Sequence, residues 1–261
     1  MSERSFSQEG FPIVVAHRGA SAEEAENTLE AFERAVAVGA DAIEFDVRLT
    51  LDGVAVVLHD AGVDRTTDGQ GLVGELTLAE VKRLRIRTTD GGATEVPTLE
   101  EALRCLSGRA AVDIEIKHLP GEPGFAPDRE AEVEATVRAL ETVGFVGPVL
   151  LSCFNPTSLA HARALAPEIP TGLLTAFDMD AREALAAARD AGHPWVLPFV
   201  GMVTHAGPGF PQEAHEAGLR LGTWLADDPA DAIALMRTGV DAVATNDPAA
   251  IVPAKREAFG S

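Results

Sequence analysis

Basic side chains are scarce in this sequence. It contains 21 Lys and Arg residues against 41 Asp and Glu residues, which gives a formal net charge of -20. A surface of that sign repels nucleic acid and anionic membranes, so the composition argues against both as partners. An anionic small-molecule substrate would have to be held by a few cations placed at its binding site.

Long apolar runs are missing as well. No stretch approaches the roughly 20 apolar residues of a membrane-spanning helix, and residues 1–7 carry no apolar signal-peptide core. Cysteine is limited to Cys105 and Cys153, too few for a disulfide framework or for a zinc site of their own. We therefore expect a cytoplasmic protein without a membrane span, in which both cysteines are small core residues.

The sequence does have the length and apolar content for a sizeable core, with 261 residues of which 46% are hydrophobic. Short apolar runs alternate with helical segments that begin at cap or turn residues, the first at Asn27 and Glu30 with capping-box spacing. Eight barrel strands are predicted, at residues 12–16, 42–47, 111–116, 149–153, 171–175, 195–199, 219–225 and 241–245. Eight strands alternating with eight helices are typical of a (β/α)₈ TIM barrel, here a single α/β domain spanning residues 1–261.

The apolar run at residues 54–59 is left out of that count. Only the six residues 48–53 separate it from the strand at 42–47, whereas a parallel crossover needs about a dozen. It is therefore predicted to form an antiparallel hairpin within a small insertion, residues 48–97, after the second strand. Arg65-Thr66-Thr67 is expected to attach this insertion to the barrel by hydrogen bonds.

The strand at 42–47 carries two carboxylates on one face. Glu44 and Asp46 lie two residues apart, and side chains alternate between the faces of a strand, so Ile43, Phe45 and Val47 form the apolar opposite face. Two enclosed carboxylates repel each other and are costly to desolvate unless they share a proton or hold a cation. We interpret Glu44 and Asp46 as metal ligands.

Further charged side chains are expected at the carboxyl ends of the strands, where the active sites of TIM barrels lie. His17 and Arg18 end the first strand, His59 ends the hairpin strand, and Glu115 and Lys117 end the third barrel strand. Three carboxylates without a thiolate favour a hard cation, Mg²⁺ or Ca²⁺. Arg18 and Lys117 are suited to a phosphate, and the two histidines to general acid and base catalysis.

In their order and spacing, the motifs of this chain resemble those of the glycerophosphodiester phosphodiesterase family over nearly the whole length. A lone His-Arg-Gly carries little information, whereas the ordered set is specific. The motifs are His17-Arg18-Gly19, Glu26-Asn27-Thr28, Ile43-Glu44-Phe45-Asp46-Val47, Leu51-Asp52-Gly53, Leu58-His59-Asp60, Arg65-Thr66-Thr67 and Ile114-Glu115-Ile116-Lys117.

The resemblance implies a TIM barrel with a small insertion, a divalent cation, and hydrolysis of glycerophosphodiesters to glycerol 3-phosphate and an alcohol. It implies metal ligands at Glu44, Asp46 and Glu115. It also implies an acid/base pair at His17 and His59, with a cyclic phosphate as intermediate. We expect His17 to be the base, because its strand neighbours the metal-binding strand, and His59 to be the acid.

Substrate contacts follow from the same resemblance. Arg18 and Lys117 match phosphate contacts, and Trp224 matches a residue that lines the pocket. The chain departs from the family pattern after Trp224, where Leu225-Ala-Asp stands in place of Thr-Val-Asn, and at Ala25, where the family usually has proline. The contacts to the glycerol or alcohol moiety are therefore the least determined by the resemblance.

Two alternatives stay open from the sequence. Another metal-dependent barrel enzyme, such as a different phosphodiesterase or a sugar-phosphate isomerase, would also need carboxylates and a phosphate site. A non-catalytic phosphate-binding barrel would be expected to lack a ligand or a histidine, and here all five are present. The preferred partner is a small glycerophosphodiester; the alcohol group, the ion and whether the chain forms a homo-oligomer are left open.

Overall fold

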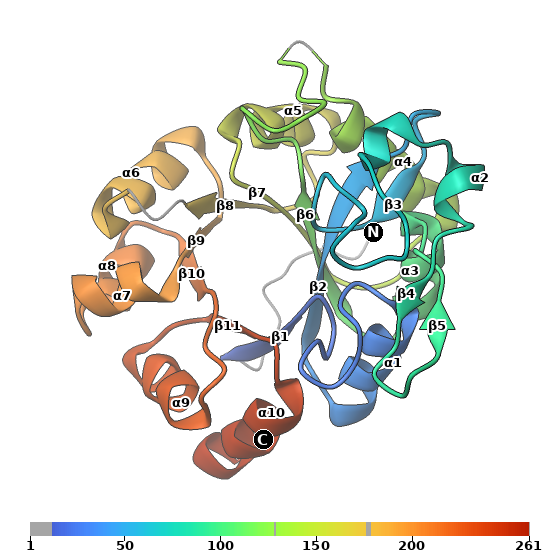
Figure 1. Cartoon of the computed structure of the whole chain (residues 1–261). Helices are drawn as coiled ribbons and strands as arrows, with labels where there is room; N and C mark the ends of the chain where they lie inside the picture. Colours follow the sequence, from blue (N-terminus) through green and yellow to red (C-terminus); the bar gives the residue numbers. More distant parts are fainter. Residues whose placement is uncertain (1–11, 128, 176–178, 261) are drawn as a thin grey trace.

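The computed structural model describes residues 12–127, 129–175 and 179–260. Eight parallel strands form a closed barrel, since β1 pairs with both β2 and β11 (Figure 1). The predicted (β/α)₈ fold is confirmed. The barrel strands are β1 (Ile13–His17), β2 (Ala42–Leu49), β6 (Ala111–Ile116), β7 (Val149–Cys153), β8 (Thr171–Thr175), β9 (Trp195–Pro198), β10 (Arg220–Thr223) and β11 (Ala242–Thr245).

Helices surround the barrel on its outer side. They are α1 (Leu29–Val38), α3 (Leu99–Leu106), α4 (Ala131–Val143), α5 (Pro156–Leu165), α6 (Ala181–Ala191), α7 (Val200–Ala206), α8 (Phe210–Glu216), α9 (Pro229–Thr238) and α10 (Pro248–Phe259). One predicted helical segment is split into α7 and α8, because Gly207, at φ 93°, ends α7 and Pro208 cannot continue it. Within the described residues no helix is long and apolar enough to cross a membrane.

The N-cap of the first helix lies one residue later than predicted. Thr28, not Asn27, is the N-cap, and its hydroxyl oxygen accepts a hydrogen bond from the Ala31 amide at 3.2 Å. Asn27 instead adopts the left-handed conformation at φ 59°, which asparagine tolerates better than most residues. Its side chain is thereby free for a different contact, described below.

The two faces of β2 are divided as its sequence predicts. Ile43, Phe45 and Val47 are fully buried between the sheet and the helices, and the Phe45 ring packs against Phe32 of α1 with centroids 5.3 Å apart. The side chains of Glu44 and Asp46 consequently point to the barrel interior. Burial of the apolar face thus holds both carboxylates in place.

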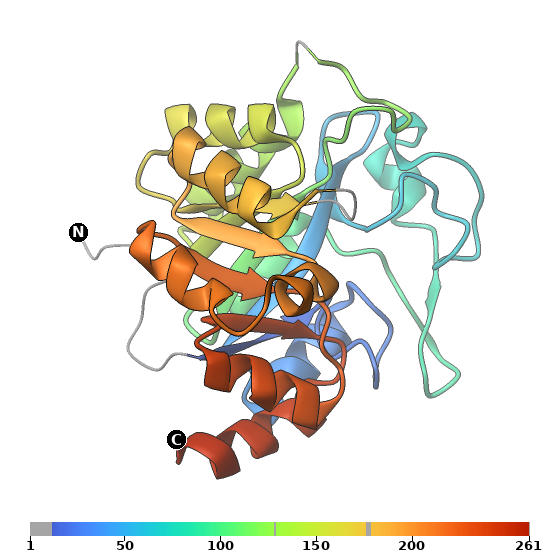
Figure 2. The same cartoon turned by 90° about the vertical axis from the view of Figure 1, so that its left-hand side faces the viewer.

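The segment between β2 and α3 stands outside the ring of helices. Its strand β3 (Ala55–Val57) runs antiparallel to β2, with Val57 opposite Val47, so the exclusion of this run from the barrel is confirmed. The segment also contains η1 (Val73–Glu75), α2 (Leu78–Val81), β4 (Ile86–Arg87) and β5 (Ala93–Thr94), and it has a small apolar core of its own. Figure 2 shows this segment on the side to which the barrel strands point.

Candidate active site

A cavity of about 270 Å³ opens at the carboxyl ends of the barrel strands. Seven of the eight residues predicted from the sequence line it, and the eighth, Asp46, lies beside them through its contacts with Arg18 and Lys117. The structure therefore brings the whole predicted set to one place. The seven lining residues are His17, Arg18, Glu44, His59, Glu115, Lys117 and Trp224.

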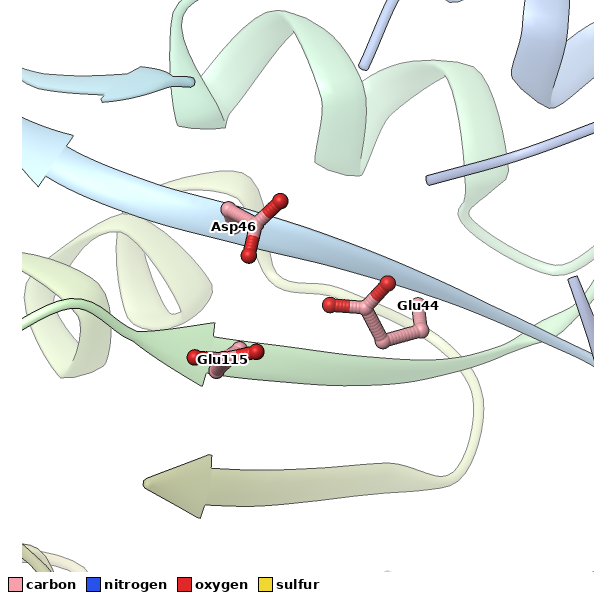
Figure 3. A group of neighbouring side chains, drawn as sticks. All are labelled: Glu44, Asp46 and Glu115. Carbon is pink, nitrogen blue, oxygen red and sulfur yellow. The ribbon is translucent and has the colours of Figure 1, made fainter. Parts of the chain in front are cut away.

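Three carboxylates form the centre of the site (Figure 3). Glu44 and Asp46 come from β2 and Glu115 from β6, where Asp46 and Glu115 are direct neighbours across the parallel pair. One oxygen of each lies within 4.8 Å of one oxygen of the other two, and all three residues are buried. We refer to these three residues as the carboxylate triad.

The triad is electrostatically strained without a cation. Burial raises the pKa of Glu44 well above its usual value, and the neighbouring Asp46 and Glu115 raise it further. Burial also raises the pKa of Glu115, although Lys117 opposes the shift. For Asp46 burial acts in the same direction, but Lys117 and Arg18 outweigh it and hold its pKa below the usual range. A divalent cation would relieve this repulsion.

The donor set fits such an ion. The second oxygen of Glu44, Oε1, is buried and accepts no hydrogen bond from the described residues, although buried carboxylate oxygens are normally paired. All three side chains offer oxygen only, and this favours a hard cation such as Mg²⁺ or Ca²⁺ over zinc. The triad is therefore a candidate site for one divalent cation.

Asn27 supports the triad, a role that the sequence analysis did not assign. Its amide nitrogen donates to Asp46 Oδ2 at 2.8 Å, and it is 2% exposed. The left-handed backbone at Asn27 turns the side chain toward β2. The Glu-Asn-Thr motif was a signal for this residue, but only the fold shows which carboxylate it contacts.

We predict that Asn27→Gly weakens cation binding about 10- to 100-fold, as loss of a hydrogen bond to a metal ligand does in other sites. Glycine keeps the left-handed backbone and removes the side chain, which donates to Asp46 Oδ2 and accepts from the Asp46 amide. Calorimetric titration of the cation-free protein with Mg²⁺ or Ca²⁺ measures the effect, with thermal melting as the control for folding. Unchanged affinity would show that Asn27 does not support the site.

Arg18 reaches the triad through a sharp turn after β1. Arg18 and Gly19 have φ values of 57° and 81°, and a Cβ at position 19 would lie 2.7 Å from the backbone of Ala31. The Arg18 amide donates to Glu44 Oε2 at 2.9 Å, and its guanidinium lies 3.3 Å from Asp46 Oδ2. The chain at this point therefore requires glycine, and the turn places a cation beside the triad.

Lys117 supplies a second cation from the end of β6. Its ammonium group lies 2.9 Å from Asp46 Oδ1 and also contacts Glu115. Burial would lower the pKa of Lys117, but the Glu115 and Asp46 carboxylates raise it above its usual value. Lys117 therefore stays charged, and together with Arg18 it offsets part of the negative charge of the triad.

His17 lies beside the triad at the end of β1, whose pairing with β2 sets His17 next to Glu44. Its Nδ1 donates to the side-chain oxygen of Asn246 at 2.8 Å, and its Nε2 lies 3.9 Å from Glu44 Oε2. Burial, with a contribution from Arg18, lowers the pKa of His17 to about 4. Asn246 is itself fixed by Asp227, which accepts from its amide at 2.8 Å. His17 is thus a neutral imidazole with Nε2 facing the triad.

His59 approaches the cavity from the insertion and is more exposed. Its Nδ1 donates to Asp60 Oδ1 at 2.6 Å, and its carbonyl oxygen accepts from Arg48 at 2.6 Å. Burial lowers the pKa of His59, while Asp46 and the Asp60 hydrogen bond oppose the shift. Asp60, which the sequence analysis named only as part of the Leu58-His59-Asp60 motif, therefore orients this imidazole.

A chain of ion pairs links the two sides of the mouth. Arg65 donates to Asp60 and makes two hydrogen bonds to Glu26, at 2.8 and 2.7 Å, and Glu26 in turn binds Arg18 at 3.0 Å. The expected attachment of the insertion to the barrel through Arg65 is confirmed. The same contacts connect His59 with Arg18, so the position of the insertion affects both sides of the cavity.

Aromatic side chains, among them Trp224 and Phe154, line the cavity on the side away from the triad. The Trp224 indole donates to the Leu197 carbonyl oxygen at 2.9 Å, and its ring meets Phe154 and Phe199 edge-on, with centroids 5.7 and 5.4 Å apart. Phe154 and Phe199 carried no signal in the sequence, because isolated aromatic residues at strand ends are common in cores. The cavity consequently has one charged wall and one aromatic wall.

Comparison with known proteins gives consistent matches. The model of the glycerophosphoryl diester phosphodiesterase family matches residues 17–250. A glycerophosphodiester phosphodiesterase of Caldanaerobacter subterraneus subsp. tengcongensis is 34% identical over 247 residues, which cover 92% of this chain and 96% of that protein.

Solved structures agree with these matches. An Oleispira antarctica phosphodiesterase, in complex with the product sn-glycerol-3-phosphate, has a TM-score of 0.81 and 29% identity, covering 94% of this chain and 96% of that one. A glycerophosphodiester phosphodiesterase of Agrobacterium tumefaciens has a TM-score of 0.76 and 27% identity, covering 92% and 99%. The family match extends over most of the chain and includes every residue of the site described above, from which it follows that the chain belongs to the glycerophosphoryl diester phosphodiesterase family.

Proposed function

We propose that this chain hydrolyses glycerophosphodiesters to glycerol 3-phosphate and an alcohol. One observation carries the proposal: a buried carboxylate triad, two histidines and two positively charged side chains, Arg18 and Lys117, meet at a single cavity. An anionic phosphodiester needs all three kinds of group, for binding, for proton transfer and for charge stabilisation. The family membership and the product found in the Oleispira enzyme support the same substrate class.

The triad would hold the divalent cation, which we propose to be Mg²⁺ or Ca²⁺. When bound, the cation would lower the pKa of a glycerol hydroxyl and offset phosphate charge. Arg18 and Lys117 lie within reach of the same centre and would contact the phosphoryl oxygens. As charge develops on these oxygens, the fixed positive charges of the two side chains stabilise it.

The two histidines would move the protons. His17 is neutral, and its Nε2 faces the triad, so it is suited to take the proton of the attacking hydroxyl. Burial lowers the pKa of His59, but His59 lies farther toward solvent than His17, and Asp46 and the hydrogen bond to Asp60 oppose the shift, so of the two histidines it is the one suited to protonate the leaving alcohol. Attack by the neighbouring hydroxyl would form a cyclic phosphodiester, which water then opens.

Trp224 would line the substrate pocket together with Phe154, while Phe199, which is not among the lining residues, packs against the Trp224 ring. The ring surfaces exclude water from one side of the cavity, which strengthens electrostatic interactions at the other. We further propose a cytoplasmic location, in keeping with the free thiols of Cys105 and Cys153. The alternative of a non-catalytic phosphate-binding barrel would use the same cavity without turnover.

The product assay distinguishes these functions. Several glycerophosphodiesters with different alcohol groups are incubated with the protein and Mg²⁺ or Ca²⁺, and glycerol 3-phosphate is measured by an enzyme-coupled assay. We expect its release in equal amount with the free alcohol. Release of glycerol and a phosphorylated alcohol would reject the proposed bond cleavage, and binding without any product would support the binding barrel.

A further inference from the structure

A fourth carboxylate lies in the cavity and has no part in the mechanism above. Asp113 precedes Glu115 by two residues on β6, and its neighbour across the sheet is Glu44. It is 8% exposed and lines the cavity. It does not belong to the compact group of oxygens that forms the triad. Its position is therefore next to the reacting centre but distinct from the proposed cation site.

Asp113 has few partners for a buried carboxylate. Among the described residues its side chain receives one hydrogen bond, from the Ser152 hydroxyl to Oδ1 at 2.7 Å, and it forms no ion pair. A buried carboxylate can accept several hydrogen bonds and is costly to bury when they are missing. Additional donors are expected to come from whatever occupies the cavity.

The surroundings of Asp113 restrict what that donor can be. Its neighbour on β7 is Leu150, which lines the cavity and belongs to the same buried apolar cluster as the lining residues Leu174 and Leu197. Thr223 is also present, but its hydroxyl donates to the Pro198 carbonyl oxygen. A ligand in this part of the cavity therefore meets carbon on most sides and the Asp113 and Ser152 pair as a polar point. A short carbon chain ending in a hydroxyl has this shape and polarity.

We propose that Asp113, held by Ser152, binds the terminal hydroxyl of the glycerol moiety and thereby selects glycerol over alcohols that lack it. This inference rests on the proposed function and adds a residue that recognises substrate. The hydroxyl it binds is the one that does not attack phosphorus. A site built to hydrogen-bond a substrate hydroxyl discriminates strongly against the analogue without it, because its buried polar group is then left unpaired.

The test compares two phosphocholine diesters, one of glycerol and one of propane-1,2-diol, which keeps the attacking hydroxyl and lacks the terminal one. For the unchanged protein we expect kcat/KM to favour the glycerol diester about 10- to 100-fold, the effect of leaving one buried polar group without its hydrogen-bond partner. In Asp113→Leu the preference should fall to within about threefold. The value of kcat/KM for the glycerol diester should fall in this variant, whereas kcat/KM for the propanediol diester should change little.

Two further variants keep the test valid if Asp113→Leu does not fold. Asp113→Asn retains one acceptor oxygen and should keep part of the preference, and Ser152→Ala, which releases the carboxylate, should reduce it. Ser158→Ala is the matched control, because Ser158 is a buried serine that contacts His118 and does not line this cavity. In Ser158→Ala the ratio of kcat/KM for the two diesters should equal that of the unchanged protein. Cation affinity, measured by titration, should stay within about threefold in Asp113→Asn.

Four outcomes would overturn the inference. Equal losses on both diesters, or a large loss of cation affinity, would mean that Asp113 acts on the triad and not on the glycerol hydroxyl. An unchanged protein that releases glycerol 3-phosphate yet treats both diesters alike would reject this inference and leave the proposed function standing. If the unchanged protein releases choline from neither diester, both this inference and the proposed function are rejected.

Discussion

Asp46→Asn should lower kcat/KM for a glycerophosphodiester about a thousandfold or more. Asp46, on β2, contacts the positively charged side chains of Arg18 and Lys117 and is one of the three carboxylates of the triad. Cation assistance is worth several kcal/mol, and each 1.4 kcal/mol corresponds to a tenfold change in rate. Steady-state kinetics with saturating Mg²⁺ or Ca²⁺ measures the loss, and removal of the cation by EDTA should abolish turnover in the unchanged protein.

A second readout separates cation binding from catalysis. An ion that binds only the folded chain raises its melting temperature, by an amount that increases with the logarithm of its affinity once the ion is in excess, so Mg²⁺ or Ca²⁺ should stabilise the unchanged protein and not Asp46→Asn. Glu33→Gln is the control, because Glu33 of α1 pairs with Arg109, just after α3, and does not line the cavity. Full activity after exhaustive chelation, or an unaltered cation response in Asp46→Asn, would contradict the assignment of the triad.

His59→Ala should lose about 10²- to 10⁴-fold in kcat/KM on a diester with an alkyl leaving group, the range for removal of a general acid. A nitrophenyl diester should recover most of that loss, because nitrophenolate leaves without a proton. His17→Ala should show a similar loss on both substrates, since removal of the base affects the attacking hydroxyl whatever group departs. Rates of alcohol and nitrophenol release measure the four combinations.

The geometry supports this division of roles. Nε2 of His17 is near Glu44, whereas His59 enters from the insertion and is held by Asp60. His161→Ala serves as the control, because His161 is half-exposed and pairs with Glu134 on the outer side of the barrel. Equal losses for both histidines on both substrates would reject the division. Rescue of His17→Ala in place of His59→Ala would exchange the two roles and keep the pair.

The local pattern of the sequence was sufficient for the fold and for the placement of the triad. The alternation in β2 puts Glu44 and Asp46 on the face opposite Phe45, and burial of that apolar face leaves them one orientation. The short link before β3 excludes a parallel crossover by length alone. Because the carboxyl ends of parallel strands share one end of a barrel, residues at those ends could be assigned to one site without knowledge of any distance.

The partners of the site residues were decided by tertiary structure. Asn27 and Asp46 are 19 positions apart, Arg65 and Glu26 are 39 apart, and His17 and Asn246 are 229 apart. Each pair meets only because barrel closure and loop conformation bring the two ends together, and the left-handed turn at Asn27 cannot be inferred from strand periodicity. Periodicity determines which face of an element a side chain occupies, whereas its contacts across the cavity depend on elements distant in the sequence. The sequence by itself therefore determined the barrel and its charged end, and the tertiary structure decided which groups orient the histidines and the triad.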